Sequence, residues 1–277
     1  MLTVMRAELT ADPVLRPAIN KETGRQHKVV DASIAYQNAE GGAKTYTHAV
    51  AWDQVAEALA GKKKGDVIEF AANLTYSEYK NANMEKGHQV LGFTILALDE
   101  SKTICQKLEE FMGVQRRPQD KDGAIFQPMR GTLYGDPVVN TVNKDGRTFD
   151  ACSVTLSYWN GKSGFPNAYV SVSAFGEEAR ALGQMKKGDA IQFVGRLDSK
   201  PYKNEKMENV HMELSYNMYS IDPERTLCRD TEKFIREEMG IEKRPLKDKL
   251  QDAEERKAGP AEVDKDTPSK EVAEPAK

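Results

Sequence analysis

Histidine and cysteine are the residues of this sequence whose types could support acid–base, nucleophilic or metal chemistry. His88 and His211 stand at matching places in two halves of the chain, and each lacks partners at the spacing of a metal site or a catalytic pair. The cysteines lie far apart without any CxxC pair, at Cys105, Cys152 and Cys228. No phosphate-binding glycine loop or nucleophile elbow occurs. The sequence therefore predicts a non-enzymatic protein without metal or cofactor, with reduced and mostly buried thiols.

A long internal repeat organises the chain. Residues 46–91 recur as residues 169–214 at a constant offset of 123 without a gap, and 19 of these 46 positions are identical. About three identities would be expected for unrelated sequences of ordinary composition. Matching residues continue upstream at an offset of 124, and downstream Phe111 recurs as Phe234. The chain therefore contains two copies of one unit, each followed by a short helix.

Each copy is predicted to contain five strands and one helix. In the first copy, alternating segments predict strands over residues 3–9, 29–36, 44–52, 66–76 and 89–98. A helix is expected between the third and fourth strands, over residues 54–61 and again over 177–183. This order is typical of the OB-fold, a small Greek-key barrel. The sequence thus predicts an all-β chain of two tandem five-stranded barrels, and a generic β-sandwich is the alternative.

Side-chain alternation predicts which aromatic residues face outward. In the third strand of the second copy, small apolar residues alternate with two serines and two aromatic residues. The serines mark their face as the wetter one, which predicts that Tyr169 and Phe175 are exposed. Tyr46 and Trp52 occupy the corresponding face of the first copy, and Trp159 is expected to be exposed on the preceding strand of the second.

The order of these motifs resembles the core of bacterial single-stranded DNA-binding proteins. Both copies carry two aromatics six residues apart, a short helix, Lys-Lys-Gly-Asp, an apolar strand and Tyr-Lys-Asn. Both also open on Arg-x-x-Leu-x-x-Asp-Pro, at residues 6–13 and 130–137, so the resemblance covers both copies nearly end to end. It implies stacking on bases by Tyr46 and Tyr169 and, in a later hairpin, by Tyr79 and Tyr202. Such stacking contributes about 1 to 3 kcal/mol per base without sequence preference.

The candidate nucleic-acid-binding residues are these aromatics and the cations beside them. The four tyrosines could instead be ordinary strand or hairpin aromatics, and Trp52 and Phe175 could plug the mouth of a barrel. Phosphate contacts are expected from neighbouring basic side chains. The candidate set is Tyr46, Tyr79, Tyr169, Tyr202, Trp52, Phe175, Trp159, Lys44, Lys80, Lys203 and Arg196.

Charge limits the kind of ligand that we expect. The net charge of the chain is −3, with 11 basic and 11 acidic residues up to position 98 and 11 and 10 over residues 127–221. Nearly neutral modules argue against strong duplex binding. The expected ligand is single-stranded DNA, bound without sequence preference and protected during replication, recombination or conjugative transfer. Single-stranded RNA is one alternative, and a protein-interaction scaffold in a replication complex is another.

The predicted organisation is a first barrel at residues 1–100, a helical linker at 101–126, a second barrel at 127–222, a helical segment at 223–257 and a tail at 258–277. The tail is rich in proline and charge without aromatics, which predicts disorder. It lacks the acidic tip with a terminal aromatic through which the family recruits partners. The resemblance implies a homodimer of four barrels, with replication or mobile-element proteins as further partners. The sequence shows no signal peptide or membrane span, which predicts a cytoplasmic protein.

Overall fold

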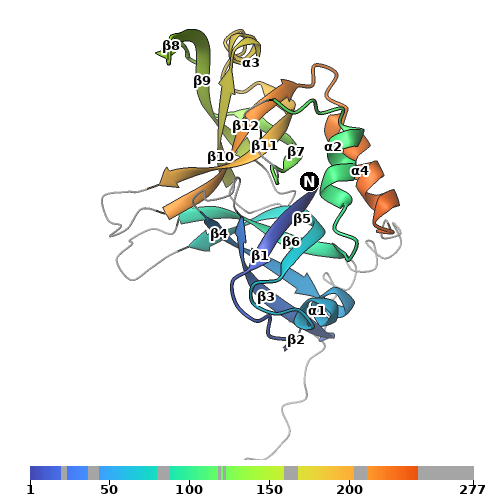
Figure 1. Cartoon of the computed structure of the whole chain (residues 1–277). Coiled ribbons are helices and arrows are strands. Elements are labelled where there is room, and N and C mark those ends of the chain that lie inside the picture. Colours follow the sequence, from blue (N-terminus) through green and yellow to red (C-terminus); the bar gives the residue numbers. More distant parts are fainter. Residues whose placement is uncertain are drawn as a thin grey trace, which may run out of the picture. The chain divides into compact units, whose positions relative to one another are not determined.

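The computed structural model describes residues 1–19, 24–36, 44–79, 88–117, 120, 123–158, 168–202 and 211–242 (Figure 1). Within these ranges, the backbone alone is described at 76–79, 88–91, 168, 199–202 and 211–214. Met1–Arg16 and Lys28–Ile241 form one compact unit, which carries both copies of the repeat, and Pro17–His27 belongs to a second unit.

Each copy of the repeat forms a module of six strands and one helix. The elements of module 1 are β1 (Leu2–Leu9), β2 (Arg16–Ile19), β3 (Gln26–Tyr36), β4 (Thr45–Trp52), α1 (Asp53–Ala60), β5 (Val67–Tyr79) and β6 (His88–Asp99). Those of module 2 are β7 (Phe126–Leu133), β8 (Val139–Lys144), β9 (Arg147–Tyr158), β10 (Ala168–Phe175), α3 (Glu177–Leu182), β11 (Ala190–Tyr202) and β12 (His211–Ile221). A further helix follows each module, at α2 (Ile104–Phe111) and α4 (Leu227–Glu238), as the repeat predicted.

The two modules share one strand connectivity. The first sheet has the order β1-β5-β6-β4-β3-β2, and the second repeats it as β7-β11-β12-β10-β9-β8. Pairing of β1 with β3, and of β7 with β9, closes each sheet into a barrel, and β4–β6 and β10–β12 are the parallel pairs. Both long strands carry an irregularity at the same place, at Ala71/Ala72 and Val194/Gly195. The prediction of two tandem OB-folds is confirmed, and the closed sheets exclude a generic sandwich.

The expected number of five strands per module was wrong, because each sheet has six. The additional strands are β2 and β8, which pair beside β3 and β9 at the sheet edge. Most of their residues are exposed on both faces, so their sequences lack the alternation by which the other strands were predicted.

Equivalent aromatic residues fill the two barrel cores. Phe70 packs edge-to-face on Phe93 with ring centroids 5.9 Å apart, and Phe193 packs on Tyr216 at 6.4 Å. All four side chains are buried. Burial of such rings is a large part of what stabilises a small barrel.

The repeated Lys-Lys-Gly-Asp motif is a turn that precedes the fifth strand of each barrel and is hydrogen-bonded to the end of the first strand. Gly188 has a φ of 93° and its backbone nitrogen donates to the Leu133 carbonyl at 2.9 Å. Asp189 accepts from the Lys186 nitrogen at 2.9 Å, and Asp136 accepts from the Lys187 nitrogen at 2.8 Å. The equivalent bonds occur in module 1. The motif is therefore recurrent turn chemistry that fixes the position of an exposed lysine.

Equivalent residues of the two modules contact each other reciprocally. The Tyr36 hydroxyl donates to the Leu197 carbonyl at 2.7 Å, and the Tyr158 hydroxyl donates to the Leu74 carbonyl at 3.3 Å. Both tyrosines are only 2% exposed. Phe111 and Phe234 stack on each other with centroids 4.3 Å apart. Reciprocal contacts of this kind are typical of a two-fold interface between like subunits, here formed inside one chain.

One contact breaks this reciprocity. The buried Gln127 side chain donates to the Val4 carbonyl and accepts from the Tyr216 hydroxyl at 2.8 Å. Thr3 stands at the position equivalent to Gln127, and among the described residues its buried hydroxyl oxygen has no hydrogen-bond partner. The interface is therefore similar, but not identical, on its two sides.

The three cysteines are buried thiols, as predicted. Burial raises the pKa of Cys228 to about 11 and raises that of Cys152 and Cys105 as well. Among the described residues, no group of three or more histidine, cysteine or carboxylate side chains could hold a metal ion. None of the helices in the described ranges has the length and apolar character needed to cross a membrane.

Candidate nucleic-acid interface

Strands β4 and β10 present the exposed aromatic residues that alternation predicted. Tyr46 and Tyr169 are 65% and 49% exposed, and Trp52 and Phe175 are 43% and 40% exposed. The residues between them on the opposite face, such as Ala49 and Val172, are buried. Six residues of strand separate the two aromatics of each pair, which is about 20 Å. Each module therefore offers two separated flat surfaces along one strand.

His48 lies between Tyr46 and Trp52 on the outer face of β4. A Cβ atom added to Gly92 would come within 2.8 Å of His48 Cε1, so the ring lies directly on the glycine backbone. Burial lowers the pKa of His48, which keeps the ring neutral at pH 7. Ser171 and Ser215 stand at the two equivalent positions of module 2. The imidazole is a third flat surface of module 1, which the sequence analysis did not identify.

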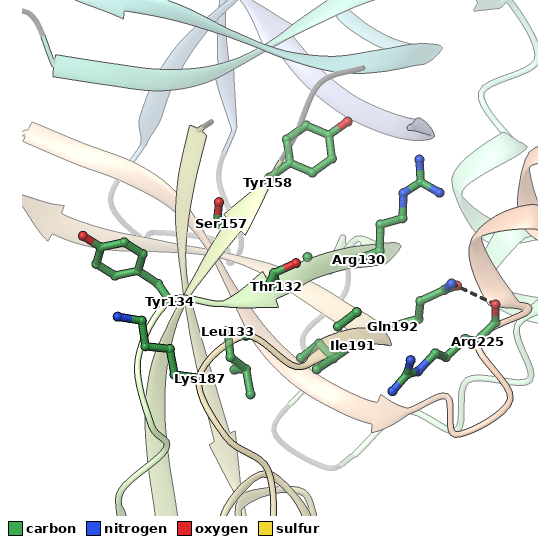
Figure 2. A pocket seen from close by; sticks show the side chains of 13 residues that line it. Arg130, Thr132, Leu133, Tyr134, Ser157, Tyr158, Lys187, Ile191, Gln192 and Arg225 are labelled. Carbon is green, nitrogen blue, oxygen red and sulfur yellow. Dashed lines mark hydrogen bonds between the residues drawn. The ribbon is translucent and has the colours of Figure 1, made fainter. Parts of the chain in front are cut away.

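Module 2 has its own additional aromatic, Tyr134, at the end of β7. Its ring is 57% exposed and meets Tyr169 edge-to-face at a centroid distance of 4.9 Å. The Lys187 ammonium nitrogen lies 6.0 Å from the centre of the Tyr134 ring (Figure 2). The sequence analysis missed this residue because Thr10 stands at the equivalent position of module 1. The sequence could have indicated this residue, because Tyr134 directly follows Leu133, the last residue of the first strand, in the motif at residues 130–137.

Phe175 also has an aromatic neighbour, because Phe149 on β9 packs edge-to-face against it at 6.0 Å. Trp52 ends β4 directly before α1, and Phe175 ends β10 with one residue between it and α3. Their exposure shows that neither ring is wholly enclosed in a barrel mouth, and their binding role stays a prediction.

Two of the predicted phosphate contacts are engaged with carboxylates. Lys44 lies 2.8 Å from Glu8, and this hydrogen bond raises the pKa of Lys44. Arg196 pairs with Asp120, whose side chain is only 2% exposed. Arg196 therefore neutralises a buried charge, and the structure gives no support for its role as a phosphate contact.

Five candidates remain. Lys80, Lys203 and Trp159 are outside the described residues. Tyr79 and Tyr202 end β5 and β11, where their backbones pair with His88 and His211. The equivalence of the two hairpins is thus confirmed for the backbone, and the stacking roles of Tyr79 and Tyr202 stay predictions.

The folded chain is a tandem OB-fold protein with an exposed aromatic strand on each barrel. Among solved structures, it is similar to the wild-type single-stranded DNA binding protein from Thermus aquaticus, with a TM-score of 0.50 and 17% sequence identity over 80% of this chain and 91% of that one. A deletion mutant of the same protein gives a TM-score of 0.50 and 16% identity over 80% and 92% of the two chains. No known family model and no curated protein matches the sequence. At this identity, the similarity shows that the two chains share a fold.

Proposed function

We propose that this protein binds single-stranded DNA without sequence preference, by stacking bases on the exposed aromatic residues of both barrels. The observation that carries the proposal is the exposure of Tyr46 and Tyr169 at equivalent positions of two OB-folds. Every base has a π-face, so a row of exposed rings binds a strand whatever its sequence. The fold is shared with the single-stranded DNA binding protein from T. aquaticus, which supports the same ligand.

The charge of the modules favours single strands over duplex. Several lysines and arginines of module 1 are already paired with carboxylates, as in Arg6–Glu69 and Lys44–Glu8. Duplex binding depends mainly on phosphate contacts, whereas single-strand binding adds the stacking of unpaired bases. The protein would act as a non-enzymatic cytoplasmic binding protein that protects single strands during replication, recombination or conjugative transfer.

The same proposal includes the organisation and assembly of the chain. We place the barrels at residues 1–100 and 127–222, with a helical linker at 101–126 and a helical segment and tail beyond 222. Two such chains would form a homodimer with four barrels. The part of the helical segment beyond residue 242 and the tail at 258–277 lie outside the described residues.

Titration with three nucleic acids tests the ligand. Binding of (dT)n, (rU)n and a mixed-sequence duplex is followed by intrinsic fluorescence and by anisotropy at two salt concentrations. We expect (dT)n to quench the fluorescence and to bind far more tightly than duplex. Equal or tighter binding of (rU)n would make RNA the ligand. Failure to bind any single strand at low salt would refute the proposal and favour a search for protein partners.

A further inference from the structure

Module 2 contains a pocket of about 600 Å³ that the aromatic strands do not form. It lies where β7, the turn before β11 and the loop before α4 meet, and it adjoins Tyr134 (Figure 2). The volume is in the range of small-molecule sites. The residues that give the pocket its chemistry are Arg130, Thr132, Tyr134, Lys187, Gln192 and Arg225. Its described lining contains three cations and no carboxylate.

The three cations come from separate elements of module 2, and backbone hydrogen bonds fix the positions of two of them. Arg130 is an exposed residue of β7. The turn fixes Lys187 through the bond from its backbone nitrogen to Asp136. The Arg225 carbonyl accepts from Gln192 Nε2 at 2.8 Å. None of the three cations forms an ion pair with another described residue, so their charges are available to a ligand.

The equivalent position in module 1 is neutralised. Arg6, the counterpart of Arg130, lies 2.6 Å from Glu69, whose side chain is fully buried. Gln192 stands where Glu69 would be expected, opposite Arg130 across the strand pair. Both side chains accept a hydrogen bond from the backbone of the following helix, Glu69 from Cys105 at 3.1 Å and Gln192 from Cys228 at 2.9 Å. The exchange therefore keeps the scaffold and removes the counter-charge.

A second exchange replaces an ion pair of module 1 with neutral side chains. Glu8, which pairs with Lys44 at 2.8 Å, is replaced in module 2 by Thr132. Thr132 lies opposite Ser157 where β7 and β9 close the barrel, so two hydroxyl-bearing residues line this edge.

The exchange of Glu69 for Gln192 raises the local charge from +2 to +3. Lys102 and Arg225 both have a positive φ, 56° and 58°, which confirms that these two loop positions are equivalent. Module 1 carries four cations and two carboxylates in this region, Arg6, Lys44, Lys64, Lys102, Glu8 and Glu69. Module 2 carries three cations and two neutral side chains, Arg130, Lys187, Arg225, Thr132 and Gln192. A concave site with this charge attracts anions.

We propose that this pocket binds a phosphate group of single-stranded nucleic acid, with the adjoining base stacked on Tyr134. The guanidinium of Arg130 can donate two parallel hydrogen bonds to one phosphate, and Lys187 supplies a point charge beside the ring. Because Tyr134 contacts Tyr169, the phosphate site is continuous with the aromatic face of β10. Module 2 therefore holds the strand more tightly than module 1 and supplies most of the salt dependence. The assignment to nucleic acid rests on the proposed function, whereas the pocket's affinity for phosphate does not.

Matched substitutions in the two modules test the pocket in the full chain. Lys187→Gln and Lys64→Gln remove one equivalent turn lysine each, and both leave the backbone bond to the aspartate intact. Arg130→Gln removes the second cation. Gln192→Glu neutralises it by introducing the carboxylate that Glu69 supplies in module 1. The measured quantity is the slope of log affinity for (dT)n against log salt. Each module 2 variant should reduce the slope by about 0.7, which is about a fivefold loss at 0.1 M salt relative to 1 M. Lys64→Gln should leave the slope unchanged.

The outcomes separate the pocket from the proposed function. If the wild type binds (dT)n and all four variants keep its slope, or Lys64→Gln matches Lys187→Gln, the pocket proposal is refuted and the stacking proposal stands. If the wild type binds no single strand, calorimetric titration with inorganic pyrophosphate tests the pocket instead. Pyrophosphate binding lost in Arg130→Gln would then assign the pocket to a free phosphate compound and overturn the nucleic-acid assignment. Absence of both kinds of binding would overturn the proposal entirely.

Discussion

The two modules have the same strands in the same order, and they differ in charge at the edge where β1 or β7 meets the turn before the fifth strand. The turn itself is built identically: Asp12 accepts from the Lys64 backbone nitrogen at 2.7 Å, and Asp136 accepts from the Lys187 backbone nitrogen at 2.8 Å. Beside it, Glu69 binds Arg6 in module 1, and Gln192 leaves Arg130 without that partner in module 2. The comparison shows that the residues needed for folding are repeated, while the charge at equivalent positions beside the turn differs.

The aromatic faces differ in a parallel way. Module 1 adds the half-buried His48 between its two exposed rings, and module 2 adds Tyr134 beside Tyr169. Module 1 therefore combines stacking surfaces with paired charges, and module 2 combines them with unpaired cations. We expect the modules to share the binding mode and to differ in strength.

Among the substitutions that test the comparison, truncation of a core ring in either module is expected to change the free energy of unfolding most. Phe70→Ala and Phe193→Ala should each lower the free energy of unfolding by about 3 to 5 kcal/mol, because both rings are fully buried. Since the modules belong to one compact unit, calorimetry should show a single transition that both variants move. Two transitions, each moved by one variant alone, would contradict the coupling of the modules.

Removal of the reciprocal hydroxyls tests the interface between the modules. Tyr36→Phe and Tyr158→Phe each leave a buried carbonyl without its donor, at a cost of about 1 to 3 kcal/mol. Tyr36→Phe removes one bond of 2.7 Å, whereas Tyr158→Phe removes a bond of 3.3 Å and the acceptor of the Met1 ammonium at 3.0 Å, so both variants should be destabilised to a similar extent. Chemical denaturation measures both, with the exposed Tyr46→Phe as a control near zero. Losses as small as the control would show that the bonds do not stabilise the interface.

The pH dependence of stability should reveal His48, which module 2 replaces with Ser171. Burial holds the pKa of His48 below its usual 6.5, so the unfolded chain takes up the proton first as the pH falls. Stability is unaffected above pH 6.5 and decreases as the pH falls through the pKa of the folded state. Because the ring is only half-buried, we expect the loss to be small. His48→Gln should reduce the difference in unfolding free energy between pH 7.5 and pH 5. An unchanged difference would exclude His48 as a source of the pH dependence.

The fold could be predicted from the sequence because its signals are local and occur twice. Strand alternation placed Tyr46 and Tyr169 on the outer face, and the repeat located both helices that follow the barrels. Strands β2 and β8 were missed because their exposed edges have no alternation. The exchange of Glu69 for Gln192 is visible in the sequence, but its meaning depends on register. Only the pairing of β1 with β5, and of β7 with β11, places these residues opposite Arg6 and Arg130.

The most direct test of the account is the affinity for (dT)n of Tyr46→Ala, Tyr169→Ala and the double variant at one salt concentration. Loss of a stacking surface should weaken binding by about 1 to 3 kcal/mol for each tyrosine, and the double variant should lose both contributions. Tyr46→Phe and Tyr169→Phe keep the ring and should bind like the wild type. Unchanged affinity in the double alanine variant would contradict the claim that these two barrels bind a single strand on their exposed aromatic faces.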